Sequence, residues 1–388
     1  MVASRPLPLR IYRTLVDNSA LLLVGAVIAL AWANLSPGSY ARFAHALHFA
    51  ANDVGMAFFF ALAAKEVFES TLPGGALGSG RRAALPVLAA SGGMLGPALL
   101  FLGIAHFLAI PGLARGWAIP CATDIAFSAL VARAIFGRGH PAVPFLLLLA
   151  IVDDALGLVI LAVFYPSGPL RPLEAVVMVG GGMAIAWLLR RSGVRSFWPY
   201  VLGAGVVSWI GLLRGGLHPA LALVPIVPLM PHAARDLGTF DERKDLQHDT
   251  LSEFEHWWKG PVEVILLAFG LVNAGVPLAS VGPATWAVVI AMMAGKPLGI
   301  GLATAAGRLA RLELADGISW RDIVVIGTVS GIGFTVALFF ATAAFPPGAL
   351  QDQAKMGALL SFLAAPIALG LGRYLKLRIS NSELRTSD

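Results

Sequence analysis

Apolar residues run in long stretches along nearly the whole chain, separated by short polar segments and by glycine- and proline-containing breaks. Each stretch is close to twenty residues long, and a helix of that length, rising about 1.5 Å per residue, spans about 30 Å of hydrocarbon. The pattern predicts an all-α polytopic membrane protein without a separate soluble domain. Its twelve predicted transmembrane helices lie at about 20–35, 54–68, 83–107, 117–136, 144–164, 173–189, 199–213, 217–231, 261–278, 284–303, 323–345 and 355–374.

The composition and the charge distribution agree with this prediction. Of the 388 residues, 57% are hydrophobic and 13% are charged, about half the charged fraction of a soluble domain. With both chain ends placed in the cytoplasm, 21 of the 28 Lys and Arg residues fall on the cytoplasmic side, where loops collect positive charge. The net charge of +6 therefore marks one side of the membrane and does not indicate an acidic partner such as nucleic acid.

Two adjacent carboxylates, Asp153 and Asp154, lie near the centre of the otherwise apolar fifth span. An ionised side chain at that depth costs about 2.5–3.5 kcal/mol, so it normally faces a cavity or an opposite charge. Successive helix residues diverge by about 100°, so the two carboxylates should have different roles. One can face a water-filled funnel and exchange ions. The other can face a neighbouring helix and pair with a cation, for which Lys296 in the tenth span is the candidate. A structural ion pair and a lysine that snorkels to the interface are the alternatives.

The fourth and eleventh predicted spans each contain a helix-breaking pattern. These patterns are Ile119-Pro-Cys-Ala-Thr-Asp124 and Ser330-Gly-Ile-Gly-Phe-Thr335, and Gly331 and Gly333 mark the second break. Backbone groups that a break releases inside the bilayer need protein or water partners, so such breaks indicate a cavity or a binding site. An ordinary kink is the alternative for the glycine pattern.

The positions of the two breaks correspond. Spans three to five (about 83–164) and ten to twelve (about 284–374) are three-helix units with the broken helix in the middle, a pattern typical of inverted repeats. If the broken helices cross, Asp124 can neutralise the facing positive N-termini and Lys296 the negative C-termini. The two units would form the ion-binding core of a single transmembrane domain, residues 1–388, with the remaining spans as scaffold.

Together these motifs resemble the NhaA family of Na⁺/H⁺ antiporters, and the resemblance runs from about the first span to the last. It implies a secondary active transporter rather than an enzyme, which exports Na⁺ or Li⁺ across the bacterial inner membrane in exchange for protons and needs no cofactor. Such a protein serves sodium and pH homeostasis. The segments that carry the resemblance agree in order and spacing: Asn52-Asp53, Ala118–Phe127, Ala150–Asp154, Asn273–Val276, Gly295–Gly299 and Gly331–Thr335.

By this resemblance Asp154 is the principal carboxylate that binds the cation and the proton, and Asp153 is its neighbour that pairs with Lys296 when the cation leaves. Thr123 and Asp124 would line the helix crossing. If one monovalent cation displaces two protons, each cycle moves one positive charge and transport is electrogenic. The two protons could come from both aspartates or from Asp154 and Lys296, because a desolvated lysine loses its proton readily.

The chain departs from the family in its regulatory region. The family carries a dense charged cluster for pH sensing after the second span, and of that cluster only Glu66 is matched here, with Glu69 standing where a basic residue is usual. Glu255, His256 and His218 fit family positions and are further candidates for pH regulation, although a lone histidine is more often structural.

Two features of the sequence stay without an assignment. Glu263, near the start of the ninth span, is an additional acid with no evident role. Family dimers use a β-hairpin between the first two spans, but the segment 36–52 is short and contains no hairpin pattern. The resemblance therefore leaves a homodimer open, formed differently or more weakly than in the family, or not at all.

Three other functions compete with antiport. A sodium-coupled symporter would need a pocket for an organic solute more than it would need two titratable carboxylates. An intramembrane aspartyl hydrolase would need its carboxyls about 3 Å apart, a geometry that facing helices supply more readily than neighbouring positions. A passive cation channel would show a repeated filter or a ring of identical acids, and the sequence contains neither.

Overall fold

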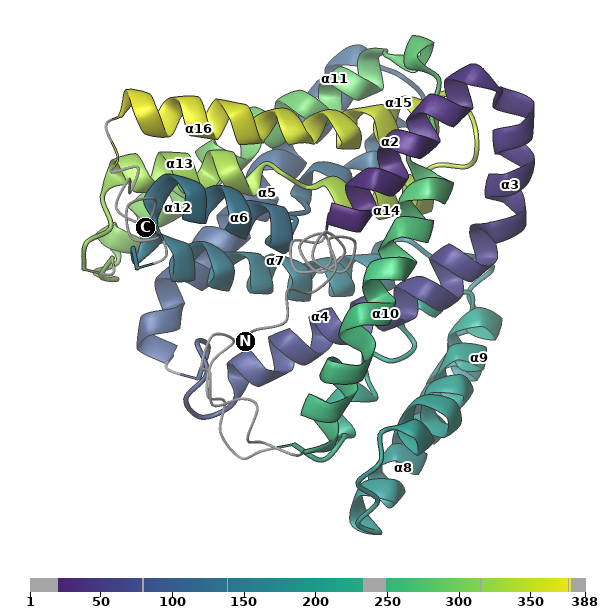
Figure 1. Ribbon diagram of the computed structural model, residues 1–388. Coiled ribbons are helices and arrows are strands. Elements are labelled where there is room, and N and C mark those ends of the chain that lie inside the picture. Colours follow the sequence, from purple (N-terminus) through teal and green to yellow (C-terminus); the bar gives the residue numbers. More distant parts are fainter. Residues whose placement is uncertain are drawn as a thin grey trace, which may run out of the picture.

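The computed structural model describes residues 20–78, 80–137, 139–232, 249–314, 316–375 and 377. All regular secondary structure of these residues is helical, which confirms the predicted all-α class (Figure 1). The two chain ends, predicted to be cytoplasmic, lie outside the described residues. The helices are α2 (Ala20–Leu35), α3 (Pro37–Phe49), α4 (Met56–Thr71), α5 (Gly80–Leu108), α6 (Ile125–Phe136), α7 (Ala142–Phe164), α8 (Pro172–Arg191), α9 (Val206–Gly215), α10 (Thr250–Asn273), α11 (Pro283–Ile290), α12 (Lys296–Leu309), α13 (Trp320–Ser330), α14 (Phe334–Ala344), α15 (Ala349–Leu360) and α16 (Ala364–Tyr374).

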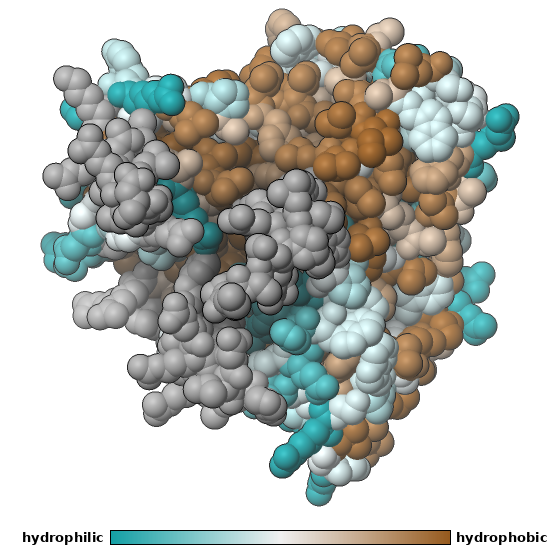
Figure 2. Space-filling view, viewed as in Figure 1, coloured by the Kyte–Doolittle hydropathy of each residue, from teal (hydrophilic) through white to brown (hydrophobic). Residues whose placement is uncertain are grey.

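Several of the helices have the length and the apolar surface that a bilayer requires. In the described parts of the chain, six helical segments are long and apolar enough to cross a membrane, and up to eight if each of two bent pairs is one span. On the face shown in Figure 2, apolar side chains gather over the upper and right-hand part, and polar side chains lie mainly at the edges and along the lower part. Apolar surface that is not packed inside the molecule is therefore suited to contact with lipid.

The predicted span at 217–231 is not a continuous helix, so this part of the prediction is wrong. It forms short 3₁₀ turns at Pro219–Leu221 and Val227–Leu229. Prolines stand at 219, 225, 228 and 231, and each removes a backbone donor and clashes with the preceding turn of an α-helix. Most of the apolar side chains are nevertheless buried, with Ile226 and Met230 fully inaccessible, as irregular backbone at membrane depth requires.

The connection between the first two predicted spans is helical. It forms α3, which continues through a π-helical turn at Ala50–Gly55 into α4. The segment 36–52 contains no strand, in agreement with the missing hairpin pattern, but the sequence did not predict a helix there.

Helices α5 and α12 approach until their backbones touch. A Cβ atom at Gly299 would lie 2.0 Å from the carbonyl oxygen of Gly92, and one at Gly96 would lie 2.4 Å from that of Gly295. Small residues four apart on both segments permit this approach. A π-helical turn at Ala291–Gly295 leads directly into Lys296, so the contact holds the start of α12, and with it Lys296, against α5.

The two interrupted helices meet at their breaks. The 3₁₀ turns ending at Cys121 are bent by 47° relative to α6, and α13 and α14 are bent by 49°. The backbone N–H of Asp124 donates to the carbonyl oxygen of Ile332 over 2.7 Å. A Cβ atom at Gly333 would lie 2.8 Å from the carbonyl oxygen of Ala122, so this crossing requires a glycine.

Candidate functional site

Asp153 and Lys296 form an ion pair in the interior of the molecule. Asp153 lies in the middle of α7 and Lys296 begins α12, and the Lys296 Nζ lies 2.8 Å from Asp153 Oδ2. Neither side chain is accessible to solvent. Mutual attraction offsets part of the cost of burying both charges. The second oxygen, Asp153 Oδ1, accepts no hydrogen bond from the residues that the structure describes, so it has capacity to bind a cation or a proton.

Thr123 joins this pair to the second broken helix. Its hydroxyl accepts a hydrogen bond from Lys296 Nζ over 2.5 Å. The hydroxyl oxygen also lies 2.7 Å from Asp153 Oδ2 and 3.2 Å from the carbonyl oxygen of Ser330, the last residue of α13. A hydroxyl has one proton, so it donates to one of these two acceptors at a time. Lys296 therefore reaches the C-terminus of α13 through Thr123 rather than directly.

Asp124 lies between two helix N-termini. It is the N-cap of α6 and accepts a hydrogen bond from the Phe127 N–H over 3.4 Å. Its other oxygen accepts from the Thr335 N–H, over 3.3 Å, and from the Thr335 hydroxyl, in the first turn of α14. Both N-termini carry partial positive charge and unpaired N–H groups, which a buried carboxylate satisfies. The Asp124 carboxylate therefore bonds to the first turns of both α6 and α14.

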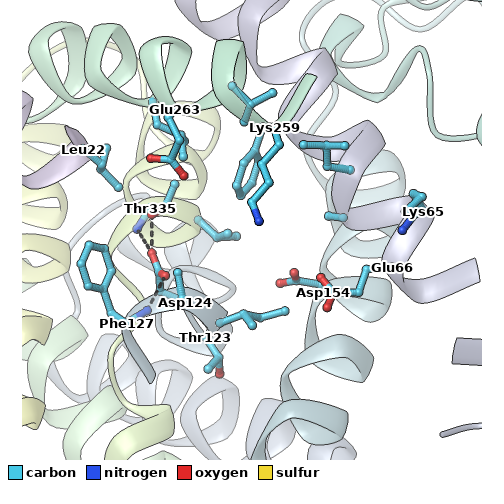
Figure 3. Close-up of a pocket in the computed structure, with 18 of the residues that line it drawn as sticks. Leu22, Lys65, Glu66, Thr123, Asp124, Phe127, Asp154, Lys259, Glu263 and Thr335 are labelled. Carbon is cyan, nitrogen blue, oxygen red and sulfur yellow. Dashed lines mark hydrogen bonds between the residues drawn. The ribbon is translucent and has the colours of Figure 1, made fainter. Parts of the chain in front are cut away.

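Asp154, the neighbour of Asp153 on α7, points elsewhere. It is partly exposed and lines a cavity of about 280 Å³. Figure 3 shows the Asp154 carboxylate beside Glu66 on one wall, with Asp124 and Thr335 on another. The 100° divergence between successive residues thus separates a carboxylate paired inside the protein from one that reaches a space large enough for water and ions.

A second cluster of charges lies at the same cavity and was not predicted from the sequence. Lys65, on α4, is buried and forms ion pairs with Glu69, over 2.7 Å, and with Glu255 on α10. The spacing of Lys65 and Glu69, four residues apart on a helix, was the available signal for the first pair. The second pair joins segments far apart in the sequence, so no local pattern reveals it.

The remaining candidates fall inside and outside this cavity. Glu66, Glu255 and Glu263 line it, whereas His256 is exposed on α10 and is not among the lining residues. His218 is separate as well, with its ring centroid 4.7 Å from that of Phe339. The structure therefore places two of the four proposed pH-regulatory residues at the cavity that Asp154 lines, and neither histidine is among the lining residues.

An apolar helical protein with two crossing interrupted helices, a carboxylate in a cavity and a buried carboxylate–lysine pair is, by class, an ion-coupled membrane transporter. A family model described as Na⁺/H⁺ antiporter 1 matches residues 10–371. The chain belongs to this family, and it is a Na⁺/H⁺ antiporter.

Individual relatives agree over nearly their whole length. Three proteins named Na(+)/H(+) antiporter NhaA are similar to this chain. The one from Desulfitobacterium hafniense (strain DSM 10664 / DCB-2) is 48% identical over 367 residues, 92% of this chain and 94% of the relative. The one from Jannaschia sp. (strain CCS1) is 47% identical over 411 residues, 94% and 97% respectively. The one from Geobacter metallireducens (strain ATCC 53774 / DSM 7210 / GS-15) is 46% identical over 371 residues, 93% and 97%.

A solved structure supports the fold. The sodium proton antiporter MjNhaP1 from Methanocaldococcus jannaschii, determined at pH 8, superposes with a TM-score of 0.54. The match covers 95% of this chain and 92% of that chain at 14% sequence identity. At this identity the likeness concerns the arrangement of helices and not individual residues.

Proposed function

We propose that the chain exports Na⁺ or Li⁺ across the bacterial inner membrane in exchange for protons, and that Asp154 is the carboxylate at which they exchange. The observation that carries this assignment is the division between the two aspartates. Asp153 is paired with Lys296 and inaccessible, whereas Asp154, one residue further along α7, lines the cavity. A carboxylate can bind either a proton or a monovalent cation, so competition between the two couples their movements.

Asp153, Lys296 and Thr123 complete the site. A cation at Asp154 would attract the Asp153 carboxylate, whose Oδ1 has no hydrogen bond from the described residues, and would weaken its pairing with Lys296. Departure of the cation restores the pair. If each monovalent cation displaces two protons, one net charge crosses per cycle, and the second proton comes from Asp153 or from Lys296.

The crossing supplies the electrostatic environment. Asp124 compensates the partial positive charge at the N-termini of α6 and α14. The positive charge of Lys296 reaches the C-terminus of α13 through the Thr123 hydroxyl. Gly331 and Gly333 permit the break. We assign these helices to a core formed by two inverted three-helix units, about 83–164 and 284–374, within a fold of twelve spans. The segment 217–231 would then cross as irregular, proline-rich backbone covered by protein.

Regulation and orientation follow from the charges around the cavity. The cavity is lined by the part of α10 that carries Glu255 and Lys259. This part precedes the ninth predicted span, at 261–278, and lies on the cytoplasmic side when both chain ends are placed in the cytoplasm. We therefore assign an inward-facing state. Glu66 and Glu255 line the cavity and are the stronger candidates for pH regulation, while His218 and His256 would act from outside it. A homodimer, if formed, would use contacts other than a β-hairpin.

Proteoliposomes with an imposed proton gradient test this proposal. Addition of Na⁺ or Li⁺ without an organic solute should dissipate the gradient, and Asp154→Asn should abolish the dissipation. Glu174→Gln is the matched control, because Glu174 is partly exposed on α8, is not among the residues that line the cavity, and pairs with Arg171 three residues before it. An Asp154→Asn protein that retains exchange would refute the site assignment, and a strict requirement for an organic solute would favour the symporter.

A further inference from the structure

Two lysines line the cavity, and their surroundings differ. Lys65 is buried and is held by two carboxylates. Lys259, on α10, is exposed, and its ammonium takes part in no ion pair with another residue in the described parts of the chain. Within these parts of the chain, the charge of Lys65 is therefore held by two carboxylates, whereas the charge of Lys259 is held by no ion pair.

The free end of Lys259 points into the cavity. Figure 3 shows the side chain extending from α10, with its ammonium directed toward the wall that carries Asp154. That wall also carries Glu66. A lysine has a flexible four-carbon stem and a compact positive charge, so rotation about its side-chain bonds moves the ammonium across the cavity without any movement of α10.

An ammonium and a sodium ion have the same charge and bind the same carboxylate oxygens. We propose that Lys259 is an internal competitor of the transported cation: rotation of its side chain brings the ammonium from the position seen in Figure 3 to the Asp154 carboxylate once the cation has left, and this pairing sets the apparent affinity for cytoplasmic Na⁺. This inference rests on the proposed assignment of Asp154 as the exchange site. Lys259 is a positioning and affinity-determining residue in this scheme, and it takes no part in the transfer of protons.

Glu263 gives the displaced ammonium an alternative position. It lies four residues after Lys259 on α10, so both side chains project from the same face of the helix. Glu263 is buried and lines the cavity. A cation that arrives at Asp154 can therefore displace Lys259 toward Glu263 within the cavity. This gives a role to an acid that the sequence left unassigned.

Kinetics in inside-out membrane vesicles test the competition, because the cytoplasmic face is then accessible. Lys259→Gln removes the competing charge and should lower the KM for Na⁺ about two- to fivefold, as expected for loss of one solvent-accessible ion pair, with an unchanged maximal rate. Lys259→Arg keeps the charge and should keep a KM close to that of the unmodified protein. Arg308→Gln, which removes a positive charge from α12 outside the cavity lining, should leave the KM unchanged.

Each other outcome would overturn the inference. An unchanged KM in Lys259→Gln contradicts competition directly. An equal fall in Lys259→Gln and Arg308→Gln would indicate a general surface potential. Asp154→Asn, assayed in parallel, separates the two proposals: if it is inactive while Lys259→Gln has a normal KM, only the role of Lys259 fails.

Discussion

The Lys296 ammonium lies 2.8 Å from the Asp153 carboxylate, and neither side chain is accessible to solvent. Such a pair contributes little stability relative to an apolar core, but removal of one partner leaves an uncompensated buried charge. Because each buried charge depends on the other for compensation, the pair also responds to a third charge. A cation or proton that arrives nearby changes the balance between pairing and separation.

Loss of Lys296 alone should destabilise the protein strongly. Lys296→Met leaves Asp153 charged and buried, which costs about 3–5 kcal/mol, so the thermal unfolding temperature in detergent should fall clearly. Lys296→Met combined with Asp153→Asn should recover part of the loss, because no charge then remains. If the two substitutions lower the unfolding temperature additively, the pair is not coupled as the geometry implies.

The hydroxyl of Thr123 should matter more than its volume. Thr123→Val is nearly isosteric, but it leaves the Lys296 ammonium and Asp153 Oδ2 each short of one hydrogen bond, a cost of about 1–3 kcal/mol. We expect a higher KM for Na⁺ and a lower unfolding temperature. Thr123→Ser keeps the hydroxyl and serves as the control, and similar behaviour of the two variants would contradict this role.

Lys65 should hold α4 and α10 together at the cavity. Its ammonium pairs with Glu69 on its own helix and with Glu255 on the other. Lys65→Met should lower stability by about 1–2 kcal/mol, less than for a fully buried pair because Glu255 is partly exposed to solvent. Differential scanning fluorimetry measures this change. Addition of Glu255→Gln to Lys65→Met should cause little further loss if the two residues act on each other.

The glycine contact between α5 and α12 should not tolerate a methyl group. Gly299→Ala places a Cβ atom 2.0 Å from the carbonyl oxygen of Gly92, and backbone cannot move aside as a side chain can, so we expect a loss of about 1–3 kcal/mol or more. Gly301→Ala, two residues further along α12, is the control because no atom lies within 4 Å of its Cβ position. It should be neutral or stabilise by about 0.4–1 kcal/mol. Equal stability of the two variants would contradict the close contact.

The charged residues inside the membrane were predictable because a bilayer makes them costly. Asp153, Lys296 and Asp124 each lie in a strongly apolar sequence, so the sequence alone requires a partner or a cavity for them. The adjacency of Asp153 and Asp154 indicated that the two carboxylates would face different directions, but only the family resemblance proposed which of them pairs with Lys296. The structure adds Thr123 as the group that joins the pair to α13.

Other features depend on tertiary contacts that no local pattern contains. The pair between Lys65 and Glu255 joins residues 190 positions apart, and Gly92 touches Gly299 only because two distant helices pack together.

The segment 217–231 misled the prediction because hydropathy reports burial and not conformation. There the prolines, rather than the apolar composition, determined the backbone.

The contact of Gly92 with Gly299 also constrains how the protein can move. With no side chain between the two backbones, α5 and α12 cannot slide past each other by a residue without collision, so they form one rigid unit. Lys296 begins α12, so any displacement of the Lys296 backbone must carry α5 with it. A label on each of these helices should report a constant separation throughout the transport cycle, while the distance from either one to α10 changes.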